Sequence, residues 1–145
     1  AEVFLAKALL DSSELLSLLS SARSCAAYGA EPDSVDGRPA FEVYPFHQGQ
    51  VLHPQLWDLL QPIAERKVEP WARHRCGCPG ACVCTVLLRR YLLDERRVHP
   101  PHFDAHAFAT CVVSLNAGEF CGGLYVQPTP RATSRQFVAL GEGDA

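Results

Sequence analysis

The stretch from Arg97 to His106 reads Arg-Val-His-Pro-Pro-His-Phe-Asp-Ala-His and concentrates side chains that can bind a metal ion. His102 and Asp104 are two residues apart, so in an extended segment both side chains point to the same face. A neutral imidazole and a carboxylate are two of the three ligands of a 2-His-1-carboxylate metal site, which favours Fe(II). A surface loop rich in His and Pro is the alternative interpretation.

The third ligand of such a site has no source nearby. His106 is in phase with Asp104, but four residues of strand span roughly 13 Å, so His102 and His106 cannot share one ion unless the chain folds back. His99 is separated from His102 by two prolines, which places it in a loop. No histidine follows His106, so the third ligand has to come from a distant segment.

Four cysteines within nine residues form a second candidate metal site. They are Cys76, Cys78, Cys82 and Cys84, with His74 just before them. Four thiolates suit Zn²⁺ or an iron–sulfur cluster, but Cys-x-Cys on both arms is cramped for one tetrahedral ion. Free thiols, a disulfide pair, and a dinuclear or partner-completed site stay open as alternatives.

The composition is that of a folded domain and excludes several classes of protein. The 145 residues are 48% hydrophobic, which excludes a disordered tail or a coiled coil. A net charge of −3 argues against nucleic acid as the main partner. The apolar runs fall far short of the ~20 residues of a membrane span. Seven cysteines, an odd number and too sparse for a disulfide-built domain, favour a reducing compartment such as the cytoplasm or an organelle interior.

Helices are expected early in the chain and strands later, which predicts an α+β protein. Asp11 and Glu14 fit a capping box that opens a helix to Ala22, and Pro54 opens a second helix that Pro62 should kink or restart. Strands are expected at residues 3–5, 41–46, 84–92, 108–115, 124–127 and 136–140, with Pro45 confining the second of them to a sheet edge or end. The pairs Arg89-Arg90 and Arg96-Arg97 are interpreted as strand-edge or loop charges.

The order of motifs along the chain carries a family resemblance. Arg90-Tyr91, His102-Phe-Asp104, Leu115-Asn116 and Phe120-Cys-Gly-Gly123 follow one another, and Gly143-Asp-Ala145 comes last. This order resembles the 2-oxoglutarate/Fe(II)-dependent dioxygenases of the prolyl 4-hydroxylase type. The likeness is strongest from residue 84 to residue 124 and includes the helix at residues 11–22.

The resemblance implies a double-stranded β-helix, a jelly roll of the cupin-like kind, with N-terminal helices packed on the sheet. It implies Fe(II) and 2-oxoglutarate as cofactors, with ascorbate as a further candidate. His102 and Asp104 would be iron ligands, and Tyr91 would contact 2-oxoglutarate, although a half-buried strand tyrosine is the alternative. Gly122 and Gly123 would form a tight turn. The family's distal histidine, its basic 2-oxoglutarate anchor and its last strands would fall just beyond residue 145.

Residues 1–145 are therefore predicted to be a single domain, incomplete at its C-terminus. Residues 1–72 would be its helical part and residues 73–145 the first part of the jelly roll. The implied activity is hydroxylation of a C–H bond in a protein or small-molecule substrate. Two alternatives stay open: a non-catalytic subunit that keeps the fold within a larger assembly, and a metal-binding module centred on the cysteine cluster.

Overall fold

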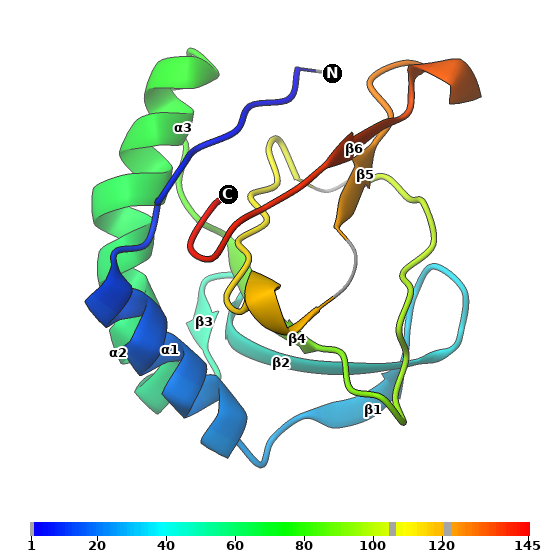
Figure 1. Ribbon diagram of the computed structural model, residues 1–145. Coiled ribbons are helices and arrows are strands. Elements are labelled where there is room, and N and C mark those ends of the chain that lie inside the picture. Colours follow the sequence, from blue (N-terminus) through cyan, green and yellow to red (C-terminus); the bar gives the residue numbers. More distant parts are fainter. Residues whose placement is uncertain (1, 105–106, 121–122) are drawn as a thin grey trace. The chain divides into compact units, whose positions relative to one another are not determined.

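The computed structural model of the chain describes residues 2–104, 107–120 and 123–145 (Figure 1). Its class is α+β with antiparallel sheets, as predicted, and among the described residues the sheets do not close into a barrel. The chain divides into two compact units, Ser20–Thr110 and a unit made of Ala1–Leu19 with Cys111–Ala145. None of the described helices is long and apolar enough to cross a membrane. The single domain over residues 1–145, with its helical part ending at residue 72, stays a prediction.

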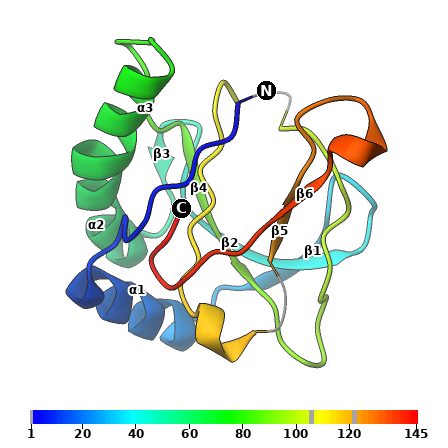
Figure 2. The ribbon, with the colours of Figure 1, turned by 45° about the horizontal axis from the view of Figure 1, so that its top comes forward.

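The unit Ser20–Thr110 contains a sheet built around one long strand (Figure 2). The strands are β1 (Gly29–Pro32), β2 (Pro39–His47), β3 (Gln50–Val51) and β4 (Thr85–Arg90). All pairings with β2 are antiparallel; β1 and β3 pair with its two ends, and β4 pairs along it at the same positions. Because a strand has two edges, β1 and β3 share one edge of β2 and β4 takes the other. The predicted strands at 41–46 and 84–92 are thus confirmed in kind, with shifted ends.

Pro45 corrects one expectation about this sheet. It lies inside the central strand β2 and is fully buried, so its predicted confinement to an edge or end is wrong. The pairing of β2 with β4 shifts register between Val43 and Phe46, and a bulge tolerates a residue that has no N–H to donate. The Pro45 carbonyl instead accepts N–H bonds from Leu52 and His53 at 2.9 and 3.2 Å, which fixes the start of the next helix.

That helix is α2 (Pro54–Ile63), and it begins at the proline that the sequence indicates. Pro62 does not break it; the regular helix ends one residue later in a π-helical turn, η1 (Ala64–Val68), and continues as α3 (Glu69–Arg75). Leu56, Leu60 and Ile63 are buried along one face of α2. Trp57 stacks on Phe46 of β2 with ring centroids 4.3 Å apart, which holds α2 against the sheet.

Helix α1 (Ser12–Ser24) begins with the predicted capping box. The Glu14 N–H donates to the Asp11 carboxylate at 2.9 Å, and the Asp11 N–H donates to the Glu14 carboxylate at 2.9 Å. Two N–H groups that lack partners within the helix are thereby satisfied, so α1 starts where the sequence places it.

The second unit contains a two-stranded antiparallel sheet of β5 (Leu124–Val126) and β6 (Gln136–Val138). Among its described residues it also contains the first part of α1 and two single 3₁₀ turns, η2 (Ala117–Glu119) and η3 (Ala132–Ser134). Gly143 has a φ of +75°, and a Cβ there would lie 2.8 Å from the Leu10 carbonyl oxygen, so both the conformation and the close approach require glycine. Gly122, predicted to form a turn with Gly123, lies outside the described residues.

Two predicted strands are wrong. Residues 3–5 are irregular. Beside them, Ala6 and Ala145 exchange two backbone hydrogen bonds. Residues 108–115 also form no strand, because Ser114 exchanges backbone bonds with Gly143 and Asp144 rather than with a neighbouring strand. An apolar, β-branched run becomes a strand only when another segment offers it a ladder, and here the described contacts are local turns and this short pairing.

Candidate metal centre

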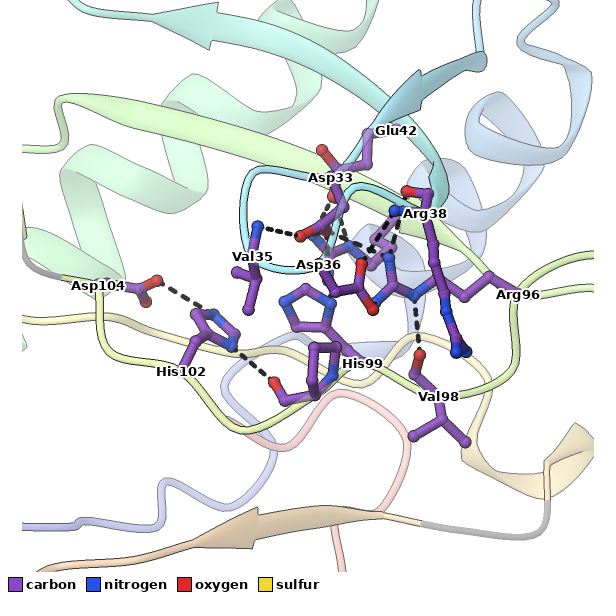
Figure 3. A network of polar contacts seen from close by, with 12 residues as sticks. Asp33, Val35, Asp36, Arg38, Glu42, Arg96, Val98, His99, His102 and Asp104 are labelled. Atoms are coloured by element: carbon purple, nitrogen blue, oxygen red, sulfur yellow. Dashed lines mark hydrogen bonds and ion pairs between the residues drawn. The ribbon is translucent and has the colours of Figure 1, made fainter. Parts of the chain in front are cut away.

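His102 and Asp104 lie in an irregular segment that follows β4 in the unit Ser20–Thr110. The structure brings their side chains together: Nε2 of His102 is 3.3 Å from Oδ1 of Asp104, and a third of each side chain is exposed. Figure 3 shows the imidazole with one nitrogen toward Asp104. The i, i+2 spacing therefore has the geometric consequence expected of an extended segment, although no strand forms.

Each of these two side chains has a second polar partner that orients it. Nδ1 of His102 lies 3.0 Å from the Pro100 carbonyl oxygen, and the Thr110 hydroxyl donates to Oδ2 of Asp104 at 2.6 Å. A carbonyl only accepts, so the contact with Pro100 calls for a proton on Nδ1, and it is Nε2 that faces Asp104. Thr110 occupies the far carboxylate oxygen and leaves Oδ1 for the imidazole.

The facing atoms have the separation that a shared cation requires. An Nε2 lone pair and a carboxylate oxygen are both acceptors, so their approach is favourable only with a proton or a cation between them. Two such donors, each about 2.1 Å from one ion at a right angle, would be about 3.0 Å apart. The observed 3.3 Å is close to this value.

Two ligands are all that the described part of the chain supplies. Among residues 2–104, 107–120 and 123–145, no group of three His, Cys, Asp or Glu side chains is arranged to hold a metal ion. His106, which the sequence sets in phase with Asp104, lies outside the described residues. The donor set fits two positions of a 2-His-1-carboxylate centre and leaves the remaining positions to other groups.

Tyr91 directly follows β4, and its hydroxyl bonds to Arg89 within the same unit. Burial lowers the pKa of Arg89, but the bonds to Tyr91 and Glu42 outweigh it and raise that pKa above its ordinary value. The tyrosine hydroxyl is therefore engaged with a guanidinium, a group that also binds carboxylates. A contact of Tyr91 with 2-oxoglutarate stays a prediction.

The cysteine cluster is held in an ordered loop after α3 but is not gathered around one point. The Val83 N–H donates to the Glu69 carboxylate at 3.0 Å, and Arg73 donates to the Ala81 carbonyl at 2.8 Å, while Arg73 and Glu69 also pair with each other. The four thiols, Cys76, Cys78, Cys82 and Cys84, all lie among the described residues, are free, and form no metal-binding group there. The cluster as a metal site stays a prediction.

A buried charge network next to the candidate centre escapes the sequence analysis. Asp33 follows β1, and its side chain is only 3% exposed; it lies 3.2 Å from Arg89, 3.5 Å from Arg96 and 3.4 Å from Nδ1 of His99 (Figure 3). Arg89 also pairs with Glu42 across the β2–β4 ladder. Arg89 lies on β4 and Arg96 in the loop after it, as the sequence indicates, and the structure adds that both are partners of carboxylates. The only signal in the sequence is the turn-like Asp33-Ser-Val-Asp-Gly37, which reveals a loop but not its partner.

The titration of the two central groups follows from this network. Burial raises the pKa of Asp33, but the Val35 N–H and the charges of His99, Arg89 and Arg96 outweigh it, so the carboxyl's pKa lies below its usual range. Burial, then the charge of Arg89, lowers the pKa of His99. Asp33 is therefore ionised and His99 neutral near pH 7.

Comparisons of this chain with protein-family models, with curated proteins and with solved structures find no match.

Proposed function

We propose that this chain carries part of the active site of an Fe(II)- and 2-oxoglutarate-dependent oxygenase of the prolyl 4-hydroxylase type. His102 and Asp104 would supply two of the iron ligands. The observation that supports this most is the facing pair of donor atoms, 3.3 Å apart, with an outer hydrogen-bond partner on each ligand. Such outer partners fix the tautomer and the orientation of metal-binding side chains.

The order of motifs adds a second line of support. Arg90-Tyr91 ends β4, and the segment with His102 and Asp104 follows it, as in the family that the sequence resembles. The α+β class and antiparallel pairing are compatible with the first part of a jelly roll, which we propose as the finer fold.

The chain's own residues would have distinct tasks in this reaction. Pro100 would hold His102 in the tautomer that presents Nε2, and Thr110 would hold Asp104 with Oδ1 toward the ion. Bound iron would supply the activation of O₂, which delivers one oxygen atom to a C–H bond and the other to 2-oxoglutarate as the latter is converted to succinate and CO₂. The substrate would be a protein side chain or a small molecule.

The proposal is tested first by metal binding. Mn²⁺, a redox-stable substitute for Fe(II), is titrated into the chain, and bound and free ion are separated by electron paramagnetic resonance. His102→Ala and Asp104→Ala should each abolish binding to one site. His53→Ala is the matched control, because His53 precedes α2 and makes no side-chain cap bond. Binding that survives both ligand variants would refute the proposed centre.

Activity is tested by succinate formation from 2-oxoglutarate in the presence of Fe(II), with the same variants. An oxygenase forms succinate, and loss of either ligand ends it. Metal binding without succinate would instead support a non-catalytic subunit that keeps the site, the alternative that the two-ligand donor set of the described residues favours.

A further inference from the structure

The turn between β1 and β2, residues 33–38, is bound to the segment that carries His102. Arg96, whose side chain is only 8% exposed, lies 2.7 Å from Asp36 and 3.5 Å from Asp33. Its Nε donates to the Val98 carbonyl at 2.8 Å. The same guanidinium therefore contacts both the turn and the backbone two residues after Arg96. The start of the segment is thereby fixed to the sheet.

His99 continues this connection toward the candidate centre. Its Nδ1 is 3.4 Å from the Asp33 carboxylate, and its ring meets the His102 ring edge to face, with centroids 4.3 Å apart and planes at 78° (Figure 3). Nδ1 of His99 is buried and has no well-aligned hydrogen bond. Because His99 is neutral near pH 7, the contact is one of packing and of the Asp33 charge with the dipole of the ring, which sets the place of the ring rather than its tautomer.

The orientation of His102 depends on this contact. Nε2 faces Asp104 only when Nδ1 meets the Pro100 carbonyl, and a rotation about the side-chain bonds would lose both. His102 is a third exposed, so solvent offers competing partners for its nitrogens. The His99 ring packs edge to face against the imidazole and restricts its rotation toward those alternatives.

We propose that Asp33 and His99 are positioning residues for His102: the buried carboxylate holds His99, and the His99 ring holds His102 with Nε2 toward Asp104. The metal-binding consequence rests on the function proposed above, whereas the orientation of His102 does not. Neither residue touches the ion. The residue at position 33 of the turn thereby affects how closely Nε2 of His102 is held toward Asp104.

The experiment compares four variants in two measurements. Nitrogen-15 NMR of the imidazoles in the metal-free chain reports the His102 tautomer, and Mn²⁺ titration reports the affinity of the centre. His99→Ala removes the ring and Asp33→Asn removes the charge. Asp36→Asn is the control, because Asp36 also pairs with Arg96 but has no contact with His99 among the described ones. His99→Phe keeps a ring against His102.

In the parent chain, Nδ1 of His102 should carry a proton directed at the Pro100 carbonyl. His99→Ala should give a mixture of tautomers and weaken Mn²⁺ binding about tenfold or more, the usual cost of losing an outer partner. Asp33→Asn should shift both measurements in the same direction. Asp36→Asn should leave both unchanged, and His99→Phe should restore the tautomer that His99→Ala loses.

The proposal is overturned if His99→Ala, still folded by circular dichroism, leaves the His102 tautomer as it is in the parent. It is equally overturned if Asp36→Asn shifts the tautomer as much as Asp33→Asn, since a general loosening of the turn would then suffice. A parent chain that binds no Mn²⁺ would count against the proposed function alone, because the NMR measurement still decides the role of His99.

Discussion

Replacing Arg89 by methionine should destabilise the unit Ser20–Thr110 strongly, because its guanidinium neutralises the buried carboxylate of Asp33 and the half-buried one of Glu42. The Arg89 side chain is 19% exposed, and its partners Asp33 and Glu42 are 3% and 16% exposed. Breaking a buried ion pair costs about 3–5 kcal/mol, since the remaining charge stays without compensation. Asp33 keeps Arg96 and the Val35 N–H as partners, so the lower end, about 3 kcal/mol, applies here.

Methionine is chosen because it keeps most of the aliphatic stem of Arg89 and isolates the loss of charge. Denaturant unfolding followed by circular dichroism gives the free energy of unfolding, and a loss of about 3 kcal/mol corresponds to about 10 °C in melting temperature for a chain of this size. Arg97→Met is the matched control. Arg97 is exposed and, among the described contacts, donates only to the Leu93 carbonyl, so its loss should cost less than about 0.5 kcal/mol.

A double-mutant cycle tests whether unpaired carboxylates cause the loss of stability in Arg89→Met. Glu42→Gln removes one of the two carboxylates that Arg89→Met leaves unpaired, so the double variant should lose less stability than the sum of the single variants. Additive losses would show that charge compensation is not what Arg89 contributes. An Arg89→Met variant as stable as Arg97→Met would refute the whole account of the network.

Two pH-dependent predictions follow from single contacts. Burial and the bond that Tyr44 donates to Glu42 raise the pKa of Tyr44 to about 12. Because this lies above the ordinary 10.0, stability should fall as the pH rises from about 10 toward 12, and ultraviolet titration of the folded chain should lose its latest phenolate step in Tyr44→Phe. Bonds from Lys7 and from two backbone N–H groups lower the pKa of Asp144 from 3.8 to about 2. Its stabilising effect is therefore complete above about pH 4 and lost toward pH 2, and Lys7→Ala should raise the NMR titration midpoint of the Asp144 carboxyl.

Local chemistry explains which elements the sequence predicts well. The capping box of Asp11 and Glu14 lies within four residues, and the proline start of α2 depends on the φ angle of Pro54 alone. The strand predicted from the β-branched and apolar run at β4 is confirmed, because β2 pairs with this run. For the two helices, the residues that decide the structure are neighbours in the chain. For β4, the partner strand is also indicated by the sequence pattern.

Elements that depend on distant partners are predicted poorly. Pro45 suggests an edge strand by its missing N–H, but the bulge opposite β4 makes a central position tolerable. The run at residues 108–115 has the composition of a strand, but within the described part of the chain its ladder-like pairing is limited to Ser114 and the segment near residue 143. Composition describes what a segment tolerates, whereas the pairing depends on which other segment reaches it.

The candidate centre also combines a feature set by neighbouring residues with one set by distant residues. The spacing of His102 and Asp104 predicts a shared face, but their orientation comes from Pro100, Thr110 and His99. His99 is in turn placed by Asp33, which is separated from it in the chain by the strands β2, β3 and β4 and by the helical stretch from α2 to α3. A motif of three residues can therefore indicate which atoms would bind an ion, but the orientation of those atoms is determined by a turn far away in the sequence. If the variants of that turn change the tautomer of His102, then chains that share the motif and differ at the turn should differ in metal affinity, although their ligand residues are identical.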